Sequence, residues 1–444
     1  MSKYTEQSWL YKAFVECYLR YSNNLMMIRK HYVVGLENLP QLGERFFIVS
    51  NHQNAANDPI NIAFSLPRDR RIGFMTRADA FNLNSSFSKL IRWLGLVPVF
   101  RAGWEGAEAL EKNNDSFDEI STKINDGMPI VVFPEGTHAQ GHYLLPLSTG
   151  TARMAFHVAE QNGWKEDIKI LPVAHHYEDY FNVQHDFLLT IGQPISLKPY
   201  YEEYQSKPYT VLRRVKKQMC EQIQQMMLDE GETDYEVKDF LRTSLLNEST
   251  RRGRSVALPE RLAIDKKFIA SLIQSPNYSE IIPLAKQMKD TEDRLGIDDS
   301  DTLYADSSTA VQTLKLAGSA IIDLILLPLW IISLWPNLLC YRIPLLLLKT
   351  DIMFVNTFRF ILNVLVLYPL FALITTAVIG FNANWTIALI YLAFYPSITL
   401  FSWYEWLHIR QTIRRFRVLT HGTEIASLKA LREKIGKMLS QIAA

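Results

Sequence analysis

The chain has 444 residues, more than one ordinary domain needs, so its character is expected to change along its length. Lysine and arginine number 47 against 46 aspartate and glutamate, giving a net charge of +1. This balance argues against nucleic-acid binding as the main function, because such proteins carry a basic excess. Three widely spaced cysteines exclude a disulfide scaffold and paired-cysteine zinc sites, and 48% hydrophobic residues exclude a disordered chain.

The first segment, residues 1–32, is expected to form an amphipathic helix. Its opening residues are polar and aromatic and lack the continuous apolar core of a secretory signal. Residues 9–32 mix aromatic and leucine side chains with lysine and arginine. A helix of this kind can lie on a membrane surface or pack on its own domain, and the sequence leaves both possibilities open.

Residues 33–200 have the pattern of an α/β domain. Five apolar runs of strand length alternate with helical stretches, and Gly, Pro or Asn lies close to each run. Strands separated by helices predict a mostly parallel sheet flanked by helices. Residues 201–310 are charged with helical spacing of apolar positions, so they predict a helical connector. The five runs are FFIVS (46–50), RIGFMT (71–76), PIVVF (129–133), IKILPVA (168–174) and FLLTIG (187–192).

Residues 311–404 are predicted to be a membrane region. The segments 360–380 and 384–403 carry no charged residue, and each approaches the ~20 residues that cross a bilayer. The short connector FNAN between them favours a transmembrane hairpin over a buried soluble one. Three prolines and Arg342 interrupt the apolar segment 318–348, so we expect a kinked hairpin that dips into one leaflet without crossing.

Basic residues flank the predicted hairpin on both sides. They place both flanks, and with them the α/β domain, on the cytoplasmic side of an integral membrane protein. The tail, 405–444, is predicted to be an amphipathic basic helix resting on anionic lipid. The flanking residues are Arg342, Lys349, Arg359, Arg410, Arg414, Arg415 and Arg417.

The strongest candidate for chemistry follows the run FFIVS. His52 lies in a turn-rich loop after a predicted strand, where α/β enzymes place reactive groups. Asp58 is the only carboxylate between Glu44 and Asp69, which makes it the obvious partner. A carboxylate bonded to one imidazole nitrogen fixes the tautomer and stabilises the imidazolium formed on proton uptake. The pair predicts a general base.

Three further sites follow or lie in apolar runs. Residues 133–137 read Phe-Pro-Glu-Gly-Thr, where Glu135 could bind hydroxyls and Gly136 lets backbone approach a ligand. Arg101 ends the stretch GLVPVFR and could bind a phosphate. Pro172 lies within an apolar strand and is expected to be part of a wall. Each site also has an ordinary structural explanation: a turn with a solvated Glu, an exposed Arg, or packing.

Together, these sites in this order resemble the phospholipid/glycerol acyltransferase family, which contains the bacterial lysophosphatidate acyltransferases. The resemblance covers roughly residues 35–200. The family's first motif falls on Asn51, His52 and Asp58, and its second ends at Arg101. Its third motif falls on Phe133, Pro134, Glu135, Gly136 and Thr137, and its fourth on Pro172.

Three departures from the family pattern affect the predicted acceptor. Five residues separate His52 from Asp58 where the family commonly has four, a spacing similar to the branch of yeast-type dual-substrate glycerol-3-phosphate acyltransferases. His138 stands where an Arg usually follows the third motif, and Ser148-Thr149-Gly150 lacks a Lys that many members have. One or two phosphate contacts are therefore absent.

The resemblance implies acyl transfer from acyl-CoA or acyl carrier protein to a glycerol phosphate or lysophospholipid hydroxyl, with no bound cofactor. His52 would act as base with Asp58, while Arg101, Glu135 and Gly136 would hold the acceptor. A glycan or aminolipid acceptor, and a non-catalytic membrane scaffold, are the alternatives. The histidines His157, His175, His176 and His185 lack the spacing of metal ligands, so no metal site is expected.

Overall fold

The computed structural model describes residues 7–82, 84–99, 108–139, 141–251, 256–298, 301, 307–347 and 352–440. The chain divides into two compact units. The first comprises Met1–Asp229 together with the short segment Ile352–Thr357. The second comprises Glu230–Asp351 and Phe358–Ala444.

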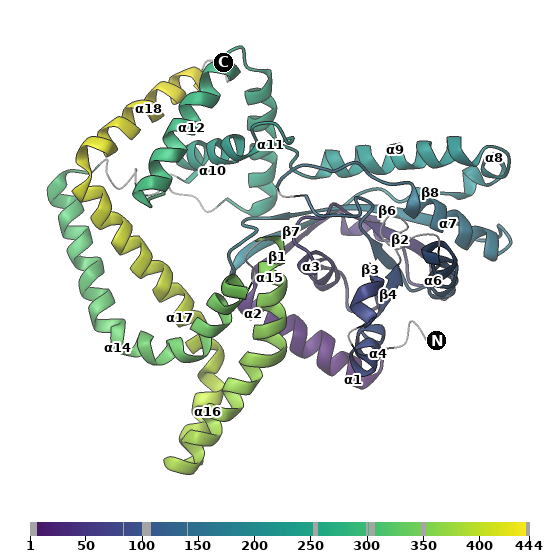
Figure 1. Ribbon diagram of the computed structural model, residues 1–444, viewed down its shortest axis with the longest axis horizontal. Coiled ribbons are helices and arrows are strands. Elements are labelled where there is room, and N and C mark those ends of the chain that lie inside the picture. The colour runs from purple at the N-terminus through teal and green to yellow at the C-terminus, as the bar shows by residue number, and fades with distance from the viewer. Residues whose placement is uncertain are drawn as a thin grey trace. The chain divides into compact units, whose positions relative to one another are not determined.

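An eight-stranded sheet forms the centre of the first unit, in the order β1-β7-β6-β2-β5-β3-β4, with β8 paired to β6 (Figure 1). Strand β6 runs antiparallel to β7 and β8, and all other neighbouring pairs are parallel. The predicted mostly parallel sheet is confirmed. The strands are β1 (Ile28–Val34), β2 (Arg45–Val49), β3 (Gly73–Arg77), β4 (Leu96–Val99), β5 (Ile130–Val132), β6 (Ile168–Tyr177), β7 (His185–Ile191) and β8 (Ile195–Ser196).

Helices cover the sheet, which explains why its central strands are apolar runs. The side chains of β5 are all buried, and β2 has no exposed side chain, as expected for parallel strands covered on both faces. One core cluster joins Phe47 and Val49 of β2 to buried residues of α6 (Glu108–Asn125), α7 (Gly150–Gln161) and α9 (Pro208–Met226). Figure 1 shows α9 and α3 (Asn57–Ser65) on opposite sides of the sheet.

The helix predicted over residues 9–32 ends earlier than expected. Helical structure runs through α1 (Trp9–Tyr11), the π-helical η1 (Lys12–Leu19) and α2 (Arg20–Met26), and the chain then enters β1. The prediction was wrong for the last part because these residues pair in parallel with β7. The helical part packs on its own unit: Arg20 is 7% exposed and donates a hydrogen bond to the Phe64 carbonyl oxygen.

The predicted connector over residues 201–310 is helical but divides between the two units. Helices α8 (Tyr201–Ser206) and α9 belong to the first unit. Three helices belong to the second unit, α10 (Tyr235–Arg251), α11 (Leu258–Gln274) and α12 (Tyr278–Leu295). Arg242 of α10 is buried and bonds the carboxylates of Glu230 at 2.6 Å and Asp265 at 3.0 Å. This ion network ties α10 to α11.

Three helical segments of the described chain are long and apolar enough to cross a membrane: 309–334, 355–382 and 385–420. A helical hairpin forms at the predicted position, from η6 (Phe360–Leu367) and α16 (Tyr368–Asn382) followed by α17 (Trp385–Thr420), and its crossing of a membrane stays a prediction. Asn384 makes the turn, and its side chain caps α17 by accepting a 2.6 Å hydrogen bond from the Thr386 backbone amide.

The expected hairpin within 318–348 is wrong, because residues 318–347 belong to one helix, α14 (Thr309–Leu347). Figure 1 shows α14 changing direction along its length. Proline bends a helix without forcing the chain to turn back, since the bend costs only local hydrogen bonds. The three prolines therefore account for a kink and not for a reversal.

The tail prediction also changes. Residues 405–420 continue α17, and a separate helix, α18 (Gly422–Ser440), follows. The apolar face of α18 is buried against the connector helices, because Ile425, Leu428 and Ile435 share a core cluster with Ile281 and Met288 of α12. An amphipathic pattern does not distinguish a protein surface from a lipid surface, and here a protein surface covers these three side chains.

Candidate active site

The loops that carry the two main motifs lie side by side in the first unit. His52 follows β2, and the Phe-Pro-Glu-Gly-Thr loop follows β5. These strands pair in parallel, with Val49 opposite Val132, so both loops emerge at the same edge of the sheet. The carboxyl ends of parallel strands are where open α/β sheets place their binding sites.

His52 and Asp58 form the pair that the sequence predicts. His52 Nδ1 lies 2.8 Å from Asp58 Oδ2. Asp58 stands in the first turn of α3, and its Oδ2 also accepts hydrogen bonds from the backbone amides of Gln53 at 2.7 Å and Asn54 at 2.8 Å. One carboxylate oxygen thus folds the loop back on itself and orients the imidazole.

The second oxygen of Asp58 is held from β6. The Tyr177 hydroxyl donates to Oδ1 at 2.8 Å, and His175 Nε2 lies 3.2 Å from the same oxygen. Burial alone would raise the pKa of Asp58, but the charges and hydrogen bonds of His175 and His52 outweigh it and hold this pKa well below its ordinary value. Burial and the charge of Asp58 raise the pKa of Tyr177 well above its usual range, so its hydroxyl stays a donor.

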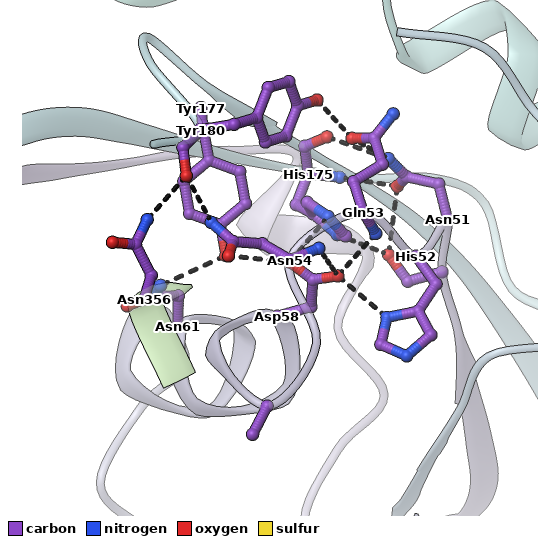
Figure 2. Close-up of polar contacts among 12 residues, drawn as sticks. Asn51, His52, Gln53, Asn54, Asp58, Asn61, His175, Tyr177, Tyr180 and Asn356 are labelled. Carbon is purple, nitrogen blue, oxygen red and sulfur yellow. Dashed lines mark hydrogen bonds and ion pairs between the residues drawn. The ribbon is translucent and has the colours of Figure 1, made fainter. Parts of the chain in front are cut away.

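The His52 ring lies at the edge of this network (Figure 2), stacked on Phe133 with ring centroids 4.0 Å apart and beside His138 at 4.1 Å. Its side chain is 15% exposed, whereas that of Asp58 is fully buried. With Asp58 accepting at Nδ1, the neutral ring presents an unprotonated Nε2. Among the described residues, none is hydrogen-bonded to that nitrogen. The arrangement can therefore take up a proton from a neighbouring group.

The Glu135 side chain links the Phe-Pro-Glu-Gly-Thr loop to the His52 loop by a hydrogen bond. Its Oε1 accepts a hydrogen bond from the His52 backbone amide at 2.7 Å, and its Oε2 accepts one from Leu145 at 2.9 Å. Burial raises the pKa of Glu135 to about 8, although these two backbone bonds oppose the change. Glu135 thus positions the backbone of His52, and its contact with an acceptor remains a prediction.

The other members of that motif form a turn beside His52. The Pro134 carbonyl accepts a hydrogen bond from the Ser148 amide at 2.8 Å. Gly136 has a left-handed backbone, with φ +71°, which favours glycine. A Cβ atom added at this position would lie in open space, with no neighbouring atom within 4 Å. Gly136 and Thr137 are exposed, so the tip of this loop is open to a ligand.

Two predicted binding residues are buried in the wall of the site. Asn51 is fully buried, and its amide bonds the backbone of His175 in both directions, at 3.0 Å and 3.1 Å. Pro172 lies in β6 opposite Val49 of β2. Asn51 thus fixes the His52 loop against β6, and Pro172 is part of the sheet below the loop. Arg101, the predicted phosphate ligand, lies outside the described residues.

Several residues of the site carry no signal in the sequence. Tyr177 and Tyr180 read as ordinary strand and loop aromatics, yet the Tyr180 hydroxyl donates to Gln53 and its carbonyl accepts from Asn54 at 3.1 Å. The adjacent His175 and His176 diverge: His175 bonds Ser50, whereas His176 lies beside His142 with ring centroids 5.0 Å apart. Adjacent side chains of a strand point to opposite faces of the sheet, so two neighbouring histidines in a predicted strand are expected to have different surroundings.

A short segment from far along the chain completes the surroundings of the site. Thr357 Oγ1 accepts a hydrogen bond from the Ala56 amide at 3.0 Å, and Asn356 Nδ2 donates to the Tyr180 carbonyl at 2.5 Å (Figure 2). The ring of Phe354 meets His138 edge-on, with centroids 5.3 Å apart. This segment belongs to the first unit, although in the chain it follows α14 of the second unit.

Comparison with known proteins agrees with the resemblance of the motifs. The similar solved structures include the crystal structure of the 1-acyl-sn-glycerophosphate (LPA) acyltransferase PlsC from Thermotoga maritima, 20% identical over 43% of this chain and 72% of that chain, with a TM-score of 0.28. No curated protein matches significantly. Residues 30–176 match the model of the Acyltransferase family. The His52–Asp58 pair and the Phe-Pro-Glu-Gly-Thr loop both lie within the residues that match this family model.

Proposed function

We propose that this protein transfers a fatty acyl group from a thioester, carried on coenzyme A or acyl carrier protein, to the hydroxyl of a glycerol phosphate or lysophospholipid. The observation that carries the proposal is the His52–Asp58 pair. Asp58 is buried and ionised. It accepts a hydrogen bond from His52 Nδ1, which leaves Nε2 of the same ring to act as a base. That arrangement suits activation of an alcohol.

The reaction follows from the ring's orientation. His52 Nε2 removes the proton of the acceptor hydroxyl while the oxygen attacks the thioester carbonyl. The tetrahedral intermediate then expels the thiolate, which takes the proton from the imidazolium, so that an ester and a free thiol result. Asp58 stabilises the imidazolium between the two steps. The acyl group never bonds to the protein, and the remaining task is to position donor and acceptor.

The exposed loop tip at Gly136 and Thr137 is the proposed contact for the acceptor, with Arg101 as the phosphate ligand. One observation favours a second candidate acceptor without phosphate. His138, which replaces the Arg usual in the resembling family, packs 4.1 Å from the His52 ring, so no guanidinium stands at this position.

A panel of acceptors tests the proposal. Purified full-length protein in detergent is given acyl-CoA or acyl carrier protein with glycerol 3-phosphate, a lysophosphatidate, or a neutral alcohol of similar size. Thiol release and the acylated product are both measured. Product with a phosphate acceptor supports the proposal, and product with the neutral alcohol alone selects the second candidate. A protein that releases no thiol with any pair would be a non-catalytic scaffold.

We also propose that the chain is integral to the membrane with its acyltransferase unit on the cytoplasmic side. Segment Ile352–Thr357 belongs to the same unit as residues before α14, so both must lie on one side of a bilayer. Helix α14 then does not carry the chain to the other side of the bilayer, whereas the hairpin of α16 and α17 crosses and returns. Its flanks are basic, as cytoplasmic flanks are.

Labelling of Cys17 tests this orientation. Cys17 is exposed in the first unit, so a variant that keeps it and replaces Cys220 and Cys340 by alanine reports the position of that unit. A membrane-impermeant maleimide should react with it only after intact cells are opened. Reaction in intact cells would reverse the orientation, and extraction of the protein by alkaline carbonate would show that it is not integral.

A further inference from the structure

Three ligand-bearing side chains gather between two apolar helices of the second unit. Asp323 lies on α14, and Glu405 and His408 lie on α17. One nitrogen or oxygen atom of each comes within 4.8 Å of the others, and His408 Nδ1 is 2.5 Å from Asp323 Oδ1. This group, the Asp-Glu-His cluster, is separate from the His52 loop in sequence and in unit.

The packing of the two helices fixes the cluster from both sides. On one side, Trp330 Nε1 donates a 3.1 Å hydrogen bond to the Ser402 carbonyl. On the other, Arg415 donates a 2.9 Å bond to the Ser319 hydroxyl. The helices run antiparallel, since residues earlier in α14 meet residues later in α17. The three side chains are therefore held on helices, which position side chains more precisely than loops do.

The cluster lies in surroundings that disfavour charge. Asp323 is the only charged residue between Lys315 and Arg342, and no charged residue occurs from position 360 to 404, directly before Glu405. Ionisable groups within such apolar helices are costly and as a rule functional. Two carboxylates next to each other in this setting require a compensating positive charge.

Among the described residues, the negative charge of Glu405 is not fully compensated. The residue is 6% exposed, and its Oε1 is buried with no hydrogen-bond partner among the described residues. His408 Nδ1 is hydrogen-bonded to Asp323, and no hydrogen bond joins the His408 ring to this oxygen. A buried carboxylate oxygen without a donor is the position at which a bound cation would be stabilised most.

The donor set suits a transition-metal ion. Glu405 and His408 are three positions apart, so they face the same side of α17, and Asp323 faces them from α14. Glu-x-x-His pairs of this kind bind metal ions between helices of bundles. One imidazole nitrogen with two carboxylate oxygens fits Zn²⁺ or Mn²⁺ better than Mg²⁺ or Ca²⁺, which prefer oxygen ligands alone.

We propose that the Asp-Glu-His cluster binds one divalent transition-metal ion that joins α14 to α17. The ion would neutralise the two carboxylates and hold the helices in register. Its role is structural, and it is independent of the acyl transfer proposed above. The protein supplies three ligands, so further coordination positions would be filled by water or backbone.

Metal content of the purified full-length protein tests this inference. The protein is prepared in detergent without chelator, loaded with Zn²⁺ and passed through a desalting column, and the retained metal is measured by mass spectrometry. Co²⁺ loading provides a second readout through its visible absorption. We expect a single retained ion per chain, with affinity lowered on the order of tenfold or more in Glu405→Gln and His408→Ala. Added Zn²⁺ should also raise the melting temperature of the wild type and not of Glu405→Gln.

Matched controls are available where α17 ends and α18 begins. Glu424→Gln and His421→Ala change the same residue types at partly exposed positions outside the cluster, so they should retain the metal as the wild type does. Wild-type protein that retains no Zn²⁺ and shows no Co²⁺ absorption would overturn the proposal, whether or not the variants fold. Equal retention by the wild type and by folded Glu405→Gln would also overturn it, because the metal would then bind elsewhere.

Discussion

Replacement of Asp58 by asparagine removes the charge behind His52 while keeping the shape of the site. The backbone amides of Gln53 and Asn54 both donate to Oδ2, so the oxygen of the new amide should take that position. His52 Nδ1 can then still donate to it. The amide nitrogen replaces Oδ1, where the hydroxyl of Tyr177 can rotate from donor to acceptor. The variant therefore keeps the tautomer and loses the negative charge.

The expected loss of rate follows from that charge. The bonded atoms of His52 and Asp58 are 2.8 Å apart, which puts the two charge centres about 4 Å apart once the imidazolium forms. At an effective dielectric of about 20, this interaction contributes about 4 kcal/mol. Because it exists only when the ring is protonated, its loss should lower kcat about 10³-fold with little change in KM.

Steady-state thiol release by purified Asp58→Asn measures this effect. Asp118→Asn is the matched control, because Asp118 pairs with His157 at 3.3 Å on the exposed surface of the same unit. The control should have wild-type activity. A melting curve shows whether Asp58→Asn is folded. A folded Asp58→Asn protein whose kcat stays within about tenfold of the control would refute this electrostatic argument.

Three other predictions concern stability and the surroundings of the site. Burial raises the pKa of Glu135 from its ordinary 4.5 to about 8. Between pH 4.5 and pH 8 the folded state therefore binds more protons than the unfolded state, so the free energy of unfolding should fall as the pH rises. Melting of Glu135→Gln should lack this slope, and equal slopes would contradict the assignment. Arg242→Ala leaves the buried carboxylate of Asp265 unpaired and should cost about 3–5 kcal/mol, seen as a lower melting temperature in detergent. Thr357→Val removes the acceptor of the Ala56 amide, a bond of about 0.5–1.5 kcal/mol, so kcat should fall by up to about tenfold without loss of folding. Unchanged kcat would mean that the segment does not help to order the loop.

The centre of the fold could be predicted from the sequence because its signals are local. Strands β2 and β5 are covered on both faces, so they appear as continuous apolar runs. Strand β4 is short, contains a proline and lies at the sheet edge, where the apolar signal is weakest. Strand β1 was mistaken for helix because its parallel pairing with β7 involves residues more than 150 positions away.

The site was predictable only where chemistry determines the residue type. His52 and Asp58, the proposed base and its partner, lie six positions apart, so their pairing could be foreseen. Tyr177 and Thr357 act through contacts that only folding creates, from a distant strand and from a segment beyond the connector helices. Asn51 was expected to touch substrate, yet a buried amide can equally serve the backbone of the next strand.

Thiol release by the purified His52→Ala variant tests the central claim most directly. Its control is His157→Ala, which removes a partly exposed histidine on α7 of the same unit. If His52 is the base, its loss should lower turnover of acyl-CoA with the best acceptor by about 10²–10⁴-fold, while His157→Ala retains wild-type activity. A folded His52→Ala protein that turns over at the control rate would contradict the account.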